Sequence, residues 1–213
     1  MLCQIAKLTY CCIAINLLTM KELDVRRLLY QTEIKRVLAA HPKSRVVDEL
    51  ELSRGEARVD VAVINDCLHG YEIKSASDNL LRLDRQQEIY KRVFEKMTLV
   101  VDEKHAHEAV KIVPSCWGLI VVGIRDGAPY ADEIWPARTN RELDPLAIAQ
   151  LLWREEIMEL MQYFDLDQGN KSKSRKLLWQ VLAKKLTVDQ LKAFVCYKLK
   201  QRNKWKARKK SRI

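Results

Sequence analysis

Apolar residues near the start of the chain recur at the spacing of one helix face. The residues that share this face are Val25, Leu28, Leu29, Val37 and Leu38. Because positions three and four apart lie on the same side of a helix, the pattern predicts one amphipathic helix over Lys21–Ala40. His41 and Pro42 follow, and proline favours a helix end at that point.

The next segment changes from helical spacing to alternation of apolar and polar residues. Alternation of this kind predicts strands with one face in a core. The three predicted strands are Arg45–Leu52, Arg58–Ile64 and Gly70–Ala76, with turn residues at Ser53-Arg54-Gly55 and Asn65-Asp66 between them. Three consecutive strands are therefore expected after the first helix.

A second helical pattern and two continuous apolar runs complete this part of the chain. The helix is expected over Asn79–Lys96, the strands over Met97–Val101 and Trp117–Val122, and a short helical segment around Glu108–Ile112. Continuous apolar runs are typical of strands covered on both faces, and a helix between strands implies a right-handed crossover to a parallel neighbour. The order helix, three strands, helix, strand predicts an α/β fold with a mixed sheet.

The pattern becomes helical again after Pro145. Helices are expected over Leu146–Phe164 and Ser174–Lys185, and Thr187-Val-Asp-Gln190 resembles a capping box that opens a third. We therefore expect three parts. They are an N-terminal extension over residues 1–19, an α/β domain over 20–143 and a basic helical appendage over 144–213.

The positive charge is concentrated at the C-terminal end. The whole chain carries +10, while residues 171–213 hold 16 Lys and Arg and one acid, a net of +15 that leaves −5 for residues 1–170. Such an asymmetry favours a polyanionic partner for the C-terminal region, and a solubilising tail is the alternative. The final residues add an aromatic to the basic run, which suits phosphate contacts with stacking. The candidate nucleic-acid contacts are Lys204, Trp205, Lys206, Arg208, Lys209 and Lys210.

Cysteine spacing and the N-terminal segment bear on the compartment. Six cysteines show no Cys-x-x-Cys pair and no regular framework, so we expect neither a zinc site nor disulfides, and a reducing cytoplasm. The apolar run Leu8–Leu18 is too short to cross a bilayer and lacks signal-peptide flanks, so no membrane partner is expected. Met1 and Met20 are both candidates for the initiating methionine. No phosphate-binding loop is found, so no nucleotide cofactor is expected.

The predicted hairpin carries three charged residues on one face. With its loop centred on Cys67, Asp60 lies opposite Lys74 and Ala62 opposite Glu72, which makes Asp60 and Glu72 diagonal neighbours about 7 Å apart. Two converging carboxylates suit a hard cation such as Mg²⁺ or Mn²⁺, and Lys74 could orient water or hold a phosphate. The alternative is that the three charged side chains are merely solvated on the surface of the hairpin.

The residue pattern alone is weakly specific, because an aspartate followed by Glu-Ile-Lys occurs a second time, at Asp24 and Glu33-Ile-Lys35 inside the first helix. In the hairpin context, however, Asp60 and Glu72-Ile-Lys74 resemble the PD-(D/E)XK nuclease superfamily over roughly residues 21–135. Gln86 and Tyr90 match the Gln-x-x-x-Tyr signature of its RecB-type branch. The wider run is also similar to an uncharacterised bacterial family placed in that superfamily. Val59 stands where the superfamily pattern has proline.

The resemblance implies a restriction-endonuclease-like core and a divalent-metal-dependent enzyme that hydrolyses phosphodiester bonds in DNA. Asp60 and Glu72 would then bind the metal with the Ile73 carbonyl oxygen, Lys74 would position water, and Gln86 and Tyr90 would complete the catalytic set. The superfamily usually adds one more acid. Glu49 and Glu33 are both candidates, and we favour Glu49 because its strand adjoins that of Asp60. A catalytically silent nuclease-fold protein for DNA binding or assembly is the alternative. The DNA structure recognised and the oligomeric state stay open.

Overall fold

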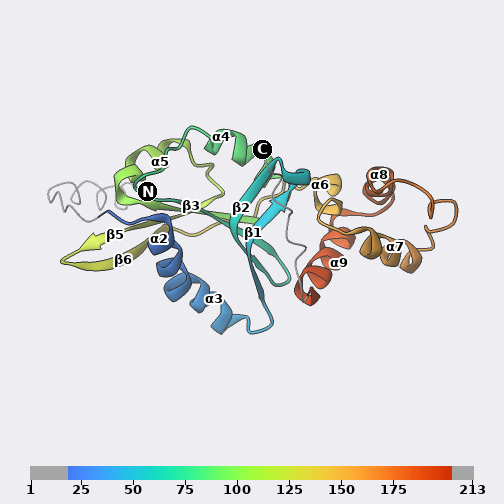
Figure 1. The fold of residues 1–213 in the computed structure, drawn as a ribbon, viewed down its shortest axis with the longest axis horizontal. Coiled ribbons are helices and arrows are strands. Elements are labelled where there is room, and N and C mark those ends of the chain that lie inside the picture. Colours follow the sequence, from blue (N-terminus) through green and yellow to red (C-terminus); the bar gives the residue numbers. More distant parts are fainter. Residues whose placement is uncertain (1–18, 203–213) are drawn as a thin grey trace, which may run out of the picture.

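The structure is a computed structural model and describes residues 19–202 of the 213-residue chain. Its centre is a six-stranded mixed sheet in the order β1-β2-β3-β4-β5-β6 (Figure 1). The strands are β1 Arg45–Leu52, β2 Ala57–Ile64, β3 Leu68–Lys74, β4 Lys96–Asp102, β5 Gly118–Arg125 and β6 Ala128–Trp135. The pairs β3–β4 and β4–β5 are parallel, and the other three pairs are antiparallel. The expected mixed α/β architecture is thus confirmed.

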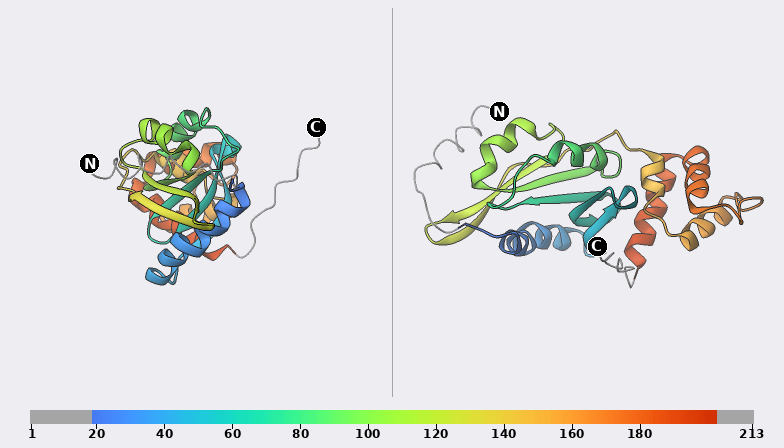
Figure 2. Two further views of the ribbon diagram at one scale, coloured as in Figure 1. Left: turned by 90° about the vertical axis from the view of Figure 1, so that its left-hand side faces the viewer. Right: turned by 45° about the horizontal axis from the view of Figure 1, so that its top comes forward.

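Helices cover both faces of the sheet and gather at one end of it. One face carries α2 Glu22–Leu29, the π-helical turn Tyr30–Ile34 and α3 Lys35–Ala40; the other carries α4 Leu83–Tyr90 and α5 Ala106–Ile112 (Figures 1 and 2). The C-terminal helices lie together beside β1 and β2. They are α6 Pro145–Ala149, α7 Arg154–Tyr163, α8 Arg175–Lys185 and α9 Val188–Gln201.

The sheet separates two hydrophobic cores. On one face, Val25 and Leu29 of α2 pack on Val61 and Tyr71. On the other face a larger core joins the sheet, α4 and α5 to the C-terminal helices, which contribute Leu178, Leu182, Leu191, Val195 and Leu199. The predicted boundary near residue 143 therefore lies within a segment that connects two parts of one continuous core. The division into domains stays a prediction.

Several predicted elements differ from the structure in length or number. The helix expected over 79–96 is restricted to α4, because Asn79 caps a turn by accepting a hydrogen bond from the Leu81 amide at 3.2 Å. The helix expected over 146–164 is divided into α6 and α7. A new helix starts after Trp153, whose amide donates to Glu156 at 2.7 Å. Strand β6 was not predicted, since its polar and apolar residues do not alternate.

The register of the β2–β3 hairpin differs from the predicted one by two residues. Val61 pairs with Tyr71 and Ile64 with Leu68, which centres the turn on Asp66 rather than Cys67. Asn65 fixes this turn, because its side-chain oxygen accepts a hydrogen bond from the Cys67 amide at 2.8 Å. The predicted pairing of Asp60 with Lys74 is therefore wrong. A shift of two keeps each side chain on its predicted face.

Among the described helices, none has both the length and the apolar composition needed to cross a membrane.

Candidate functional site

Asp60 and Glu72 meet where β2 and β3 diverge. Continuing the observed register beyond Val61 and Tyr71 places Asp60 across from Glu72. The Asp60 Oδ2 atom accepts a hydrogen bond from the backbone amide of Ile73 at 2.7 Å. This bond fixes the carboxylate of one strand against the backbone of the next. The two predicted acids are therefore brought together, more directly than the predicted diagonal contact.

Glu72 is held by three donors from two elements. Its carboxylate accepts hydrogen bonds from Lys74 Nζ at 2.7 Å, Gln86 Nε2 at 2.6 Å and the Tyr90 hydroxyl at 2.7 Å. Glu72 is only 2% exposed. Because a buried carboxylate is costly unless it is paired and hydrogen-bonded, this network is what allows the charge to lie there.

Helix α4 positions the side chains of Gln86 and Tyr90 one turn apart on the same face. The Tyr90 ring is fully buried and packs near the rings of Phe94 and Trp117, each with its centroid 6.1 Å away. Burial and the neighbouring Glu72 charge raise the pKa of Tyr90 well above its ordinary value, so it stays a donor. The structure thus places Lys74, Gln86 and Tyr90 around Glu72.

Of the two candidates for the additional acid, the structure brings Glu49 to Asp60. Its neighbours Asp48 and Leu50 pair with the two neighbours of Asp60, so Glu49 lies across from Asp60. Glu49 has a φ of 57°, a left-handed conformation unusual for a residue with a side chain. Glu33 instead accepts hydrogen bonds from the Tyr71 hydroxyl at 3.2 Å and from Arg36 at 2.9 Å, on the face covered by α2.

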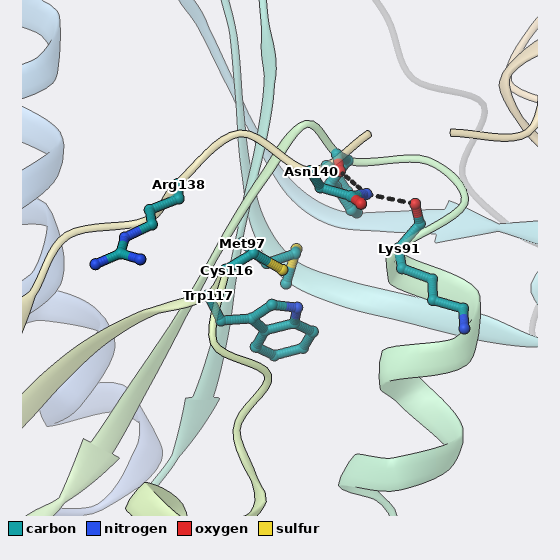
Figure 3. Close-up of a pocket in the computed structure, with 7 residues that line it drawn as sticks. Lys91, Met97, Cys116, Trp117, Arg138 and Asn140 are labelled. Carbon is teal, nitrogen blue, oxygen red and sulfur yellow. Dashed lines mark hydrogen bonds between the residues drawn. The ribbon is translucent and has the colours of Figure 1, made fainter. Parts of the chain in front are cut away.

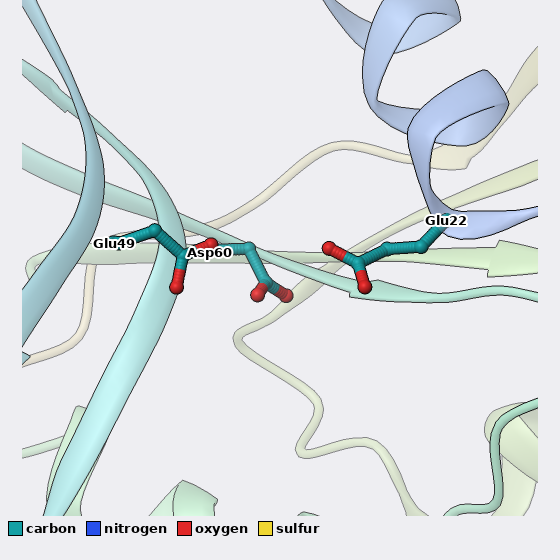
Figure 4. A group of neighbouring side chains, drawn as sticks. All are labelled: Glu22, Glu49 and Asp60. Atoms are coloured by element: carbon teal, nitrogen blue, oxygen red, sulfur yellow. The ribbon is translucent and has the colours of Figure 1, made fainter. Parts of the chain in front are cut away.

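Two further charged residues of the site were not predicted. Glu22 of α2 joins Glu49 and Asp60, so that one oxygen of each lies within 4.8 Å of the others (Figure 4). Arg26 lies among them, with its Nη2 atom 3.0 Å from Glu22, 2.7 Å from Glu49 and 3.6 Å from Asp60. In the sequence, Glu22 and Arg26 resemble any surface Glu–Arg pair at positions i and i+4 of a helix, so nothing marked them as site residues. We call Glu22, Glu49, Asp60 and Glu72 the acid site.

The charges of the acid site affect one another. Burial, followed by the Glu72 charge, raises the pKa of Asp60 to about 7, although the Ile73 amide and Arg26 act in the opposite direction. Burial disfavours the Arg26 charge, but hydrogen bonds to Glu22 and Glu49 and the charge of Asp60 raise the pKa of this guanidinium. Two close carboxylates, one of them partly protonated near neutral pH, can accept a further cation.

A space between α4 and β5 is not a ligand site. It is bordered by Lys91, Met97, Cys116 and Trp117 (Figure 3), and its free volume is 0 Å³. Asn140 closes it, because its amide donates to the carbonyl oxygens of Lys91 at 2.6 Å and Phe94 at 3.0 Å. These contacts attach the segment after β6 to the end of α4, which is a structural role.

The basic C-terminal region is partly described. The candidate nucleic-acid contacts Lys204, Trp205, Lys206, Arg208, Lys209 and Lys210 lie outside the described residues. Within α9 and just after it, four basic residues form ion pairs with acids of other elements. These pairs are Lys192–Glu95, Lys198–Glu159, Lys200–Asp66 and Arg202–Glu156. Part of the C-terminal charge therefore attaches the helices to the rest of the fold.

Comparison with known proteins assigns the family. The family described as Bacteriophage P4 protein cII matches residues 17–212. The chain belongs to this family. It is 29% identical over 157 residues to Protein cII of Enterobacteria phage P4, a match that covers 74% of this chain and 59% of that protein. The chain thus spans less than two thirds of the length of this relative. No solved structure matches the chain.

This assignment corrects the identification made from the sequence. The resemblance to the PD-(D/E)XK superfamily and to a bacterial family within it is wrong, because the match is to a phage protein family and no nuclease family is found. The predicted activity, a metal-dependent nuclease or hydrolase, is wrong with it, since neither comparison identifies an enzyme. The geometry around Asp60, Glu72, Lys74, Gln86 and Tyr90 is nevertheless present and requires another explanation.

Proposed function

We propose that this member of the phage P4 cII family binds DNA together with a divalent cation, Mg²⁺ or Mn²⁺, at the acid site. The observation that carries the proposal is the pairing of two fixed, largely buried carboxylates, Asp60 and Glu72. Burying like charges side by side costs folding free energy, and a bound cation offsets that cost. Groups held at such a cost are candidates for function.

The donor set suits a hard cation. Carboxylate and carbonyl oxygens are the ligands preferred by Mg²⁺ and Mn²⁺, and the proposed ligands are Asp60, Glu72 and the Ile73 carbonyl oxygen. Asp60 Oδ2 accepts from the Ile73 amide, which leaves Oδ1 for a metal. Glu72 accepts three hydrogen bonds, while a carboxylate has about four acceptor positions.

Arg26 balances the acid site and leaves Asp60 accessible to a cation. Its contact with the Asp60 carboxylate, at 3.6 Å, is longer than those with the Glu22 and Glu49 carboxylates, at 3.0 and 2.7 Å. Arg26 also donates to the backbone carbonyl oxygen of Asp60 at 2.9 Å, which a cation at the side chain would not displace. A cation at Asp60 would therefore compete with the weakest of the three contacts. Arg26 would keep its pairs with Glu22 and Glu49, and so would hold α2 in place.

DNA is the proposed partner because Mg²⁺ in proteins is usually bound by one or two carboxylates together with phosphate oxygens. Lys74 adds a positive charge beside that position, with its Nζ atom 2.7 Å from Glu72. The basic C-terminal region would contact further phosphates, which gives affinity without sequence preference. For the architecture we propose a restriction-endonuclease-like arrangement of the first helix and strands. The proposed function ends at binding and includes no hydrolytic step.

The proposal is tested by the fluorescence anisotropy of labelled DNA titrated with the full-length protein, in Mg²⁺ and in EDTA. The compared proteins are the wild type, Asp60→Asn and the control Asp132→Asn. Asp132 lies on β6, is 51% exposed and pairs with Arg125, so the control makes the same chemical change outside the acid site.

We expect Mg²⁺ to strengthen binding by the wild type and the control by about tenfold, as expected for about 1.4 kcal/mol of coupling. Asp60→Asn should bind equally in Mg²⁺ and EDTA. DNA binding that is absent in both conditions, or a Mg²⁺ effect that persists in Asp60→Asn, would contradict the proposal.

A further inference from the structure

A cleft of 380 Å³ lies between the sheet and the C-terminal helices. Arg54 and Arg58 line it from the β1–β2 side, and Arg175 and Arg202 line it from the helical side (Figure 1 shows α6 beside these strands and α8 beyond it). We propose that this cleft binds a phosphate-bearing nucleotide unit, either free or in a single strand of nucleic acid, through Arg54, Arg58 and Arg175.

Three of the arginines present their side chains at the surface of the cleft. Arg175 lies over the ring of Trp179 at 4.8 Å, and because this tryptophan is only 3% exposed it forms a fixed support. Arg58 is 60% exposed and its Nε atom is held by Glu49 at 2.6 Å. Arg54 is exposed at the centre of a turn with three consecutive positive φ values, 47°, 63° and 93° for residues 53, 54 and 55.

Arg202 has a different role. Its side chain is 5% exposed, and it donates to Glu156 at 2.5 and 2.8 Å and to the Leu151 carbonyl oxygen at 2.7 Å. Its guanidinium also lies 4.0 Å from the centre of the Trp153 ring. Arg202 is therefore part of the cleft wall rather than a contact for a ligand.

The charges that face the cleft favour an anion. Four arginines and three acids line the cleft. Of the acids, Asp48 accepts hydrogen bonds from Arg26 and Tyr30, Glu49 is paired with Arg26 and Arg58, and Glu51 is exposed. Within residues 19–202, no ion pair is found for Arg54 or Arg175. The two guanidinium groups can thus bind phosphate oxygens, for which their planar geometry is well suited.

The size of the cleft and its aromatic residues define the ligand further. A volume of 380 Å³ is in the range of sites for small molecules and admits one nucleotide, whereas a duplex is far wider. The rings of Trp153 and Trp179 already have Arg202 and Arg175 over them, so we expect phosphate contacts to dominate over base stacking. Binding should then show little preference among bases.

The cleft adjoins the acid site, because Glu49 belongs to both. A strand held at the acid site could therefore extend one nucleotide into the cleft. If the ligand is a nucleic-acid strand, the inference rests on the proposed function and specifies single-stranded nucleic acid as the ligand class. For a free nucleotide it stands without that function.

The test compares full-length wild type with Arg54→Gln/Arg175→Gln by calorimetric titration. The ligands are dTMP, a ten-nucleotide single strand and a blunt duplex of the same length. The control is Arg27→Gln/Arg141→Gln, which removes two exposed arginines that do not line the cleft. Far-UV circular dichroism and thermal unfolding verify that each variant is folded, which we expect because all four side chains are exposed.

We expect the cleft variant to bind the single strand at least tenfold more weakly than the wild type, and the control to stay within twofold. If dTMP shows the same loss, the ligand can be a free nucleotide; if only the oligonucleotide does, it is a strand. Equal affinities of the cleft variant and the control for both ligands would overturn the inference. So would a duplex that binds with the same dependence on Arg54 and Arg175. Intact Mg²⁺-dependent DNA binding in the cleft variant would leave the proposed function standing. No DNA binding by the wild type would refute that function together with the strand-bound form of the inference, and the dTMP titration would then decide the free-nucleotide form.

Discussion

At the scale of single residues, the acid site is a set of charges held by specific donors. The Ile73 amide fixes Asp60, and Lys74, Gln86 and Tyr90 fix Glu72. The sequence predicted this group because alternation places Asp60, Glu72 and Lys74 on one face of the strands. Arg26 and Glu22 could not be predicted, since the packing of α2 against β1 depends on tertiary contacts that helical periodicity does not specify.

The Asp60 charge should reduce the stability of the metal-free protein. Its pKa is about 7 in the folded state and lower when unfolded, so the folded state binds more protons between about pH 4 and pH 7. Stability from this group is therefore greatest at low pH and is lost as pH rises to about 7. A rise of about 3 pKa units corresponds to about 4 kcal/mol, so Asp60→Asn should raise the free energy of unfolding at pH 8 by up to about 4 kcal/mol and change it little at pH 4. Urea unfolding in EDTA measures this difference. A less stable variant at pH 8, or an equal gain in Asp132→Asn, would contradict it.

The Tyr90 hydroxyl should stabilise the fold through Glu72. Tyr90→Phe removes a donor to a carboxylate that is 2% exposed, so we expect a loss of about 1–3 kcal/mol. Tyr163→Phe is the matched control, because Tyr163 is 77% exposed and should tolerate the change. Chemical denaturation of both variants provides the comparison. If Tyr90→Phe were as stable as the control, the role given to this hydroxyl would be wrong.

At the scale of elements, the sequence predicted most strands and helices, but it did not predict where each begins and ends or where one helix breaks into two. The hairpin was expected with the correct faces and a register two residues away, because the Asn65 side chain decides where the turn closes. The break between α6 and α7 was missed, since the apolar spacing continues across it and only the Glu156 cap reveals the new helix. Local hydrogen bonds of single side chains thus set details that periodicity leaves open.

The contact between α7 and the end of α9 depends on Arg202. Its guanidinium connects the residue after α9 to Glu156 of α7 and to the Leu151 carbonyl oxygen. Arg202→Met would leave Glu156, whose side chain is 12% exposed, without this partner, and should cost about 3 kcal/mol. Arg141→Met serves as the control on an exposed residue. Thermal and urea unfolding measure both, and a loss in Arg202→Met below 1 kcal/mol would mean that this contact is held mainly by apolar packing.

At the scale of the whole molecule, the sheet and the C-terminal helices share one hydrophobic core. The sequence suggested a division near residue 143 because the composition changes there, but composition does not report which apolar faces meet. The cleft lies where these two parts adjoin, and Glu49 of β1 belongs both to the cleft and to the acid site. The fold could be outlined from pattern, whereas the family assignment came from comparison with known proteins and corrected the nuclease identification.

A shared core predicts that the whole chain unfolds as one unit. Far-UV circular dichroism, which reports all helices, and tryptophan fluorescence should give coincident urea transitions. Removal of residues 144–213 should leave a fragment that lacks a cooperative transition, because it would expose apolar residues such as Leu50 and Leu52. Separate transitions, or a stably folded fragment over 20–143, would instead support two independent domains.

The central claim, a cation site at Asp60 and Glu72 completed by DNA, is tested most directly by counting bound Mn²⁺. Electron paramagnetic resonance of free Mn²⁺, titrated into the full-length protein with and without DNA, gives the number of ions bound. We predict about one Mn²⁺ per chain in the presence of DNA, weaker binding without it, and loss of this ion in Asp60→Asn but not in Asp132→Asn. If no Mn²⁺ bound in the presence of DNA, or if Asp60→Asn bound as much Mn²⁺ as the wild type, the account would be contradicted.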